Sequence, residues 1–205
     1  MKDMTITYEV DGALYVNITN RCSNRCTFCI RNNGDGAYGS NSLWLSREPT
    51  SEEIFESIKN ADPSNYSELV FCGYGEPTER LDVLVEVAKK VKECFDVKIR
   101  VNTNGHSSLI HNFNTAPMYK DVIDAVSISL NAPNAKEYDK VCKSVFGEAA
   151  FDGLLDFASK VKNYVPSVIL TVVDVALSEQ EIAECKELAD KVGVPLRVRK
   201  YIGKE

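Results

Sequence analysis

Three cysteines close together near the start of the chain restrict its chemistry more than any other feature. The segment reads Cys22-Ser-Asn-Arg-Cys26-Thr-Phe-Cys29. Three thiolates can hold three corners of a cubane [4Fe–4S] cluster and leave one iron open, whereas an electron-transfer cluster takes four. Structural zinc would need a fourth nearby ligand, and His106 and His111 lie far along the chain. The spacing therefore favours a cluster with an open iron, with zinc as the alternative.

A second motif follows an apolar run and consists of Gly73, Tyr74, Gly75, Glu76 and Pro77. An apolar run of this kind is typical of a buried parallel strand. Glycine lets the backbone approach a ligand closely, and proline suits the first position of a helix. The motif predicts a strand, a ligand-binding turn and a helix, and an ordinary strand–helix turn is the alternative.

Strand-like and helix-like segments alternate along the chain, which has 205 residues, enough for one domain with a sizeable core. Expected strands cover residues 13–19, 68–72, 96–102, 125–130, 167–175 and 195–202. Expected helices cover residues 50–61, 78–95, 134–163 with a break near Gly147, and 178–192. Capping boxes open the first and last helices, at Thr50 and Ser178.

Six strands joined by helical connections predict an α/β fold with a parallel sheet. Six units are too few to close an eight-stranded barrel, so the expected architecture is an open (β/α)6 partial TIM barrel forming one domain over residues 1–205. In such folds the active site lies at the carboxyl ends of the strands. Both motifs fall at such ends.

The composition fits a cytoplasmic enzyme. Hydrophobic residues make up 44% and charged residues 26%, and the formal net charge is −6. The acidic balance disfavours broad nucleic-acid binding, and no apolar stretch predicts a membrane span or signal peptide. Seven cysteines without a leader indicate metal chemistry rather than disulfides, in a reducing or anaerobic cytoplasm. The remaining cysteines are expected to be buried small hydrophobic residues: Cys72, Cys94, Cys142 and Cys185.

The cysteine motif, with the aromatic Phe28 before its last cysteine, resembles the cluster loop of the radical SAM superfamily. The glycine motif resembles that family's G-G-E-P motif, with Tyr74 in place of the first glycine. The resemblance implies a [4Fe–4S] cluster in the loop at residues 19–31, with S-adenosylmethionine (SAM) on its open iron. It also implies one-electron cleavage of SAM to a 5′-deoxyadenosyl radical that abstracts hydrogen from a substrate.

The resemblance also assigns side chains around SAM at the strand ends. It places Phe28 near the adenine and the backbone of residues 73–77 near the amino group. Other assignments are Asn102, Thr103 and Asn104 for the methionyl part, Ser129 and Asn131 for the ribose, and Arg199 and Tyr201 for the adenine or the substrate.

The polar stretch at residues 32–42 is a candidate lid, with Arg31 and Trp44 expected to become ordered on binding. It follows the cluster loop directly and is long for a βα connection, although a mobile surface loop is the alternative. Arg31 and His106 are the candidate catalytic groups. His106 and His111 could act as acid–base groups or lie on the surface.

Within the superfamily, the whole chain looks most like the small TatD-family-associated radical SAM proteins, which implies a functional link to a TatD-like hydrolase. Glycyl-radical activating enzymes are the alternative, but they typically have acidic residues at the positions of Asn102 and Ser129 and a histidine at that of Ile30. A non-catalytic iron–sulfur redox sensor is a second alternative. The expected partners are a flavodoxin or ferredoxin electron donor and a small-molecule or protein substrate.

Overall fold

The computed structural model describes residues 4–174 and 177–200. Its centre is one seven-stranded sheet in which the strands follow their order in the chain. The strands are β1 (Thr7–Val10), β2 (Ala13–Val16), β3 (Leu69–Phe71), β4 (Ile99–Thr103), β5 (Ala125–Ser129), β6 (Ser167–Val173) and β7 (Leu196–Arg199). Strands β2 to β7 are parallel to their neighbours, and β1 is antiparallel to β2. In the described residues the two edge strands do not pair, so the sheet is open.

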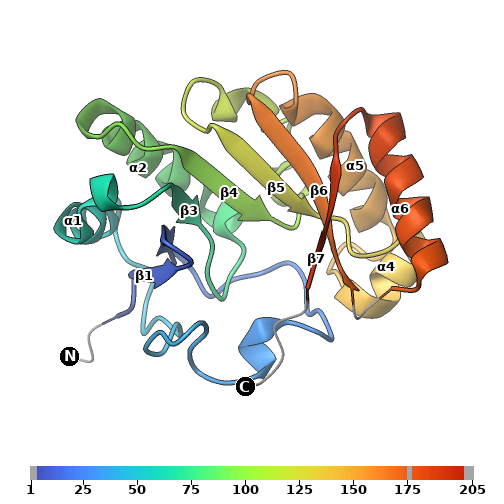
Figure 1. The fold of residues 1–205 in the computed structure, drawn as a ribbon, viewed down its shortest axis with the longest axis horizontal. Coiled ribbons are helices and arrows are strands. Elements are labelled where there is room, and N and C mark those ends of the chain that lie inside the picture. Colours follow the sequence, from blue (N-terminus) through green and yellow to red (C-terminus); the bar gives the residue numbers. More distant parts are fainter. Residues whose placement is uncertain (1–3, 175–176, 201–205) are drawn as a thin grey trace.

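Helices connect the parallel strands and lie along the outer side of the curved sheet, while the long segment after β2 crosses its other side (Figure 1). The α-helices are α1 (Ser51–Ala61), α2 (Leu81–Cys94), α3 (Ser107–His111), α4 (Ala135–Cys142), α5 (Ala149–Val161) and α6 (Glu179–Val192). The expected open (β/α)6 partial barrel is confirmed. Among the described residues, no helix has the length and apolarity needed to cross a membrane.

Strand β1 is absent from the strands predicted from the sequence. It forms a hairpin with β2 through Asp11 and Gly12, whose φ angles are 49° and 75°. Two residues with positive φ are the pattern of a type I′ hairpin turn, for which Asp-Gly is a strong sequence signal. The signal was therefore present in the sequence, and β1 adds an antiparallel edge to the six predicted strands.

The predicted helices differ from the observed ones mainly at their ends. The capping boxes at Thr50 and Ser178 are both present, and they start α1 and α6. The helix expected from residue 78 begins instead as a 3-10 turn, Pro77–Arg80, and α2 follows it. The expected break near Gly147 separates α4 from α5, and Gly147 has a φ of 57°.

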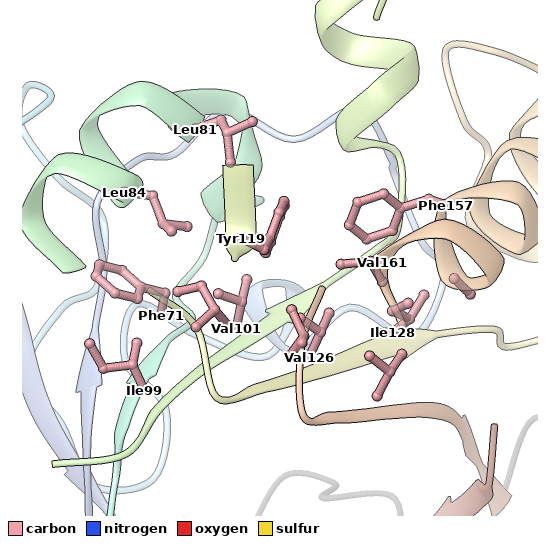
Figure 2. Close-up of a cluster of buried hydrophobic side chains, with 14 of the residues drawn as sticks. Phe71, Leu81, Leu84, Ile99, Val101, Tyr119, Val126, Ile128, Phe157 and Val161 are labelled. Atoms are coloured by element: carbon pink, nitrogen blue, oxygen red, sulfur yellow. The ribbon is translucent and has the colours of Figure 1, made fainter. Parts of the chain in front are cut away.

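The main hydrophobic core lies between the sheet and its outer helices (Figure 2). On β4 and β5 the residues Ile99, Val101, Val126 and Ile128 are almost fully buried against α2 and α5. Side chains alternate between the two faces of a strand, so the intervening residues, such as Asn102, face the other side. The core thus fixes which polar side chains the sheet presents to its inner face.

Candidate active site

The inner face of the sheet borders a cavity of about 250 Å³ at the carboxyl ends of the strands. Its lining includes most of the residues singled out in the sequence: Cys22, Cys26, Phe28, Cys29, Gly73, Tyr74, Glu76, Asn102, Thr103, Asn104, Ser129, Asn131 and Arg199. It does not include Arg31, Gly75, Pro77 or His106. Tyr201 lies outside the described residues. The fold therefore gathers both motifs and the predicted strand-end side chains around one space.

Strand register explains why polar residues from four strands meet there. Asn102 of β4 is paired with Ser127 of β5, and Ser129 is paired with Thr171 of β6. Arg199 of β7 is paired with Val173, which also lines the cavity. Laterally paired residues share a face of a sheet. This pairing places Arg199 on the inner face, a point that the alternation in the sequence left open.

The loop carrying the three cysteines has no regular secondary structure and is held by backbone hydrogen bonds to its neighbours. The N–H groups of Arg25 and Thr27 donate to the carbonyls of Cys142 and Val141, both at 2.9 Å. These are two of the final carbonyls of α4, which lack partners within the helix. On the other side, the N–H of Glu76 donates to the carbonyl of Arg21 at 2.7 Å. The cysteine loop is thus clamped between α4 and the glycine motif.

The two glycines of the second motif allow that close packing. A Cβ added at Gly75 would lie 2.3 Å from the carbonyl oxygen of Thr19 and 2.6 Å from that of Arg21. A Cβ at Gly73 would lie 2.1 Å from Oδ1 of Asn17. Glycine is therefore required at position 75 because the backbone of the cysteine loop packs against it, and at position 73 because the Asn17 side chain does. Gly75 supports the loop from behind, while Gly73 also lines the cavity.

Glu76 organises the ends of β3 and β4. Its Oε1 accepts hydrogen bonds from Oγ1 of Thr78 and Oγ1 of Thr103, both at 2.7 Å, and its Oε2 accepts one from the backbone N–H of Asn104 at 2.7 Å. Burial raises the pKa of this carboxyl, while the hydrogen bonds act in the opposite direction. With both carboxylate oxygens engaged, the Glu76 side chain acts as a structural tie.

Tyr74, the residue that departs from the family motif, anchors the predicted lid. Its hydroxyl donates to the carbonyl of Gly34 at 2.7 Å, and its ring packs edge-on against Trp44. With Tyr8, Val10, Ala37 and Leu43 it forms a second small buried cluster. The stretch at residues 32–42 is therefore packed against β1 in this structure, whereas a role as a lid stays a prediction.

The three cysteine thiols have raised pKa values. Burial, with a smaller contribution from the Glu76 carboxyl, raises the pKa of Cys22 to about 12, and burial also raises that of Cys29. The pKa of Cys26 is raised chiefly by its side-chain hydrogen bond with Cys142. Metal ligation requires thiolates, so cluster assembly at this site would release protons and would be favoured by higher pH.

No three histidine, cysteine, aspartate or glutamate side chains within the described ranges are close enough to bind one metal ion together. Zinc holds all its ligands on a single ion, whereas in a cubane each cysteine binds a different iron.

Unpaired polar atoms beside the cysteines show that the cavity suits a polar ligand. Oδ1 of Asn24, Oδ1 of Asn131 and Nε of Arg199 are buried and have no hydrogen-bond partner, and all three residues line the cavity. A buried polar atom without a partner is costly. SAM carries hydroxyl and ammonium donors for the amide oxygens and a carboxylate for the guanidinium, so these residues fit it.

His106 is fully buried below the cysteine loop rather than at the surface, and it does not line the cavity. Its Nδ1 is 3.3 Å from Oγ of Ser23 and its Nε2 is 3.2 Å from Oη of Tyr138. Nδ2 of Asn24 donates to the same hydroxyl at 3.0 Å. Burial lowers the pKa of His106 to about 4. His106 is thus a neutral support of the loop, and its assignment as a catalytic acid–base group is not supported.

This environment of His106 predicts a specific loss of stability in acid. The unfolded chain protonates His106 near pH 6.5 and the folded chain only near pH 4, so the free energy of unfolding falls as the pH drops through that window. The expected loss between pH 7 and pH 4.5 is roughly 2–3 kcal/mol. Urea denaturation of the metal-free protein should show it in the wild type, and His106→Gln should lose less over the same range. Equal losses in both proteins would contradict this reading of His106.

Arg31 supports the loop from outside the cavity. Its guanidinium donates to the carbonyl of Tyr74 at 3.5 Å and to that of Asn24 at 3.3 Å. It therefore bridges the glycine motif and the cysteine loop and does not face the cavity, as a catalytic group would. His111, the other predicted acid–base candidate, is near the carbonyl of Thr78 and likewise outside the lining.

Two of the remaining cysteines differ from the expected buried hydrophobic residues. Cys94 is exposed at the end of α2, and Cys72 lies just after β3 and lines the cavity. Cys142 and Cys185 are buried as predicted. The supporting roles of Asn24 and Tyr138 were missed, since tyrosine on an amphipathic helix gives no sequence signal for a hydroxyl network.

The family model for the radical SAM superfamily matches residues 16–189. The chain belongs to the radical SAM superfamily, whose enzymes use a [4Fe–4S] cluster to cleave SAM. Solved structures agree in fold: a radical SAM methyltransferase from Sphaerobacter thermophilus has a TM-score of 0.66 at 15% identity, covering 95% of this chain and 68% of that one. Streptococcus suis SuiB bound to its precursor peptide SuiA has a TM-score of 0.67 at 15% identity, covering 93% and 39%.

Curated relatives are similar over most of this chain but are longer. A probable GTP 3′,8-cyclase from Thermococcus kodakarensis is 29% identical over 90% of this chain and 55% of its own length. Molybdenum cofactor biosynthesis protein 1 from Dictyostelium discoideum is 25% identical over 92% of this chain and 28% of its own length. The chain thus spans about half or less of these two relatives.

Proposed function

We propose that Cys22, Cys26 and Cys29 hold the [4Fe–4S] cluster and that the cavity beside them binds SAM. When bound and reduced, such a cluster would supply the one electron needed to cleave the C5′–S bond of SAM into methionine and a 5′-deoxyadenosyl radical, and that radical would take a hydrogen atom from the substrate. The observation that carries the proposal is the meeting of all three cysteines with three unpaired buried polar groups around one cavity.

The chain's own residues orient SAM in this proposal. Phe28 offers an aromatic face for the adenine. The Ser129 hydroxyl can donate or accept hydrogen bonds with the ribose hydroxyls, and Oδ1 of Asn131 can accept one. Arg199 offers its buried Nε–H to a carboxylate or phosphate. Asn102 is already tied through Oδ1 to Arg100 at 2.8 Å and through its side chain to Cys72, so only part of its amide N–H₂ group is left for the ligand.

The substrate would enter beside the second cluster of hydrophobic residues. A groove of about 1020 Å³ lies between β1 and residues 33–40 and shares Tyr8, Ile30, Ala37 and Tyr38 with the cavity. On β7, Arg197 lies near Arg100 and Arg199. Burial lowers the pKa of Arg197 most, and the charges of these two arginines lower it further. Glu68 neutralises Arg100 through two hydrogen bonds. The groove itself is lined by Glu9, Asp11 and Asp35, whereas Arg199 and Lys200 line the cavity. An anionic group on a small molecule or protein segment would therefore lie on the cavity side.

A GTP-like substrate is the most specific candidate, because the curated relatives are named GTP 3′,8-cyclases and the arginines suit a phosphate. Joining C3′ to C8 requires loss of the hydrogen at C3′. GTP deuterated at C3′ should therefore transfer deuterium to 5′-deoxyadenosine in the reduced, reconstituted protein. Transfer from a different labelled metabolite or peptide, with none from GTP, would replace this candidate while keeping the reaction class.

The link to a TatD-like hydrolase and the flavodoxin or ferredoxin donor also remain proposals. A donor must bring one electron per SAM cleaved, and either protein class supplies single electrons. Replacing dithionite by reduced flavodoxin or ferredoxin in the same reaction tests the donor.

A further inference from the structure

Cys142, which is not one of the three predicted cluster ligands, is buried at the end of α4 next to the predicted ligand Cys26. Cys26 packs against the hydrophobic core that contains Cys142, and an interaction between the two thiols is the largest cause of the pKa shift of each. Cys142 has no exposed surface. The backbone bonds from Arg25 and Thr27 to Cys142 and Val141 flank Cys26 on both sides. These two main-chain bonds fix the position of Cys26 relative to Cys142. The packing of the cysteine loop on α4 therefore keeps the two thiols close together.

Asn131 connects this thiol pair to the cavity. Its Nδ2 donates to Sγ of Cys142 at 3.8 Å, and its Oδ1 is buried without a partner. The residue is 5% exposed and follows β5 with a φ of 57°, within the lining of the cavity. The Asn131 amide thus orients the Cys142 sulfur through its Nδ2 group. Its Oδ1 atom can accept a hydrogen bond from a ligand in the cavity.

We propose that Cys142 is a positioning residue that donates an S–H hydrogen bond to Sγ of Cys26 when Cys26 binds iron. This inference rests on the proposed role of Cys26. A cysteine bound to iron is a thiolate without a proton, so Cys142 is the member of the pair that can donate. Asn131 donates to the Cys142 sulfur and leaves its S–H free to point at Cys26.

Such a hydrogen bond would tune the cluster. Hydrogen bonds to cluster sulfurs are among the factors that set the reduction potential. The reduced cluster carries more negative charge on its sulfurs than the oxidised one, so a donor stabilises the reduced form more and raises the potential. Cys142 would therefore ease the reduction that must precede SAM cleavage.

The test is a redox titration of the reconstituted protein without SAM, followed by electron paramagnetic resonance of the reduced cluster, in wild type, Cys142→Ala and Cys142→Ser. We expect full iron content in all three proteins. Loss of the donor in Cys142→Ala should disfavour reduction by about tenfold, which corresponds to a potential lower by about 59 mV for one electron. Cys142→Ser keeps an O–H donor and should recover part of the shift. Cys185→Ala removes a buried thiol on α6 and should leave the potential unchanged.

An unchanged or higher potential in Cys142→Ala would overturn the inference, and so would a potential in Cys142→Ser equal to that in Cys142→Ala. Loss of iron in both variants would also overturn it, because Cys142 would then be a ligand or a structural support. These outcomes are distinct from failure of the proposed function, in which the wild-type protein itself would bind no cluster or cleave no SAM.

Discussion

Replacing Cys26 by alanine is expected to remove the [4Fe–4S] cluster, and Cys22→Ala and Cys29→Ala should do the same. A [4Fe–4S] cluster held by three protein thiolates loses one of its three protein ligands in each of these variants. Iron and sulfide analysis after anaerobic reconstitution should give about four irons per chain in the wild type and close to none in each variant.

The matched control is Cys94→Ala, because Cys94 is exposed at the end of α2, away from the cavity lining. It should retain all of the iron. Full iron retention by Cys26→Ala would refute the assignment of the cluster ligands, whatever the fold.

Gly75→Ala is expected to lower both the stability of the protein and its iron content. The new methyl group would collide with two backbone carbonyls of the cysteine loop, those of Thr19 and Arg21. Neither can rotate away as a side chain would, so the loop or the turn must move. Overpacking of this severity is expected to cost about 3 kcal/mol or more, and the displaced loop should bind iron poorly. Chemical denaturation followed by circular dichroism measures the first effect, and iron analysis the second.

Gly34→Ala is the comparison for this variant, since a Cβ at Gly34 meets nothing within 4 Å and its carbonyl still accepts from Tyr74. It should differ from the wild type by less than about 0.5 kcal/mol. If Gly75→Ala were as stable as Gly34→Ala, the close contact between the glycine motif and the cysteine loop would be wrong.

The sequence predicted the fold well where local patterns and tertiary packing agree. Capping boxes located α1 and α6, and apolar runs located the parallel strands. Strand β1 escaped prediction although Asp11-Gly12 marked its turn. The start of α2 shifted because Pro77 and Glu76 build a 3-10 turn first.

Prediction of the site was limited by contacts between distant segments. The cysteine and glycine motifs were readable because each is contiguous. The burial of His106 and the contact of Cys142 with Cys26 depend on how α4 docks under the loop, which no local spacing encodes. The face of β7 on which Arg199 lies became clear only from its register with Val173.

The most direct test of the account is product analysis of the reduced, reconstituted wild-type protein incubated with SAM. Chromatography with mass spectrometry should find 5′-deoxyadenosine and methionine in equal amounts, formed slowly without substrate and absent when either dithionite or the cluster is omitted. An intact, reducible cluster that yields neither product with any electron donor, or that cleaves a different bond of SAM, would contradict the account.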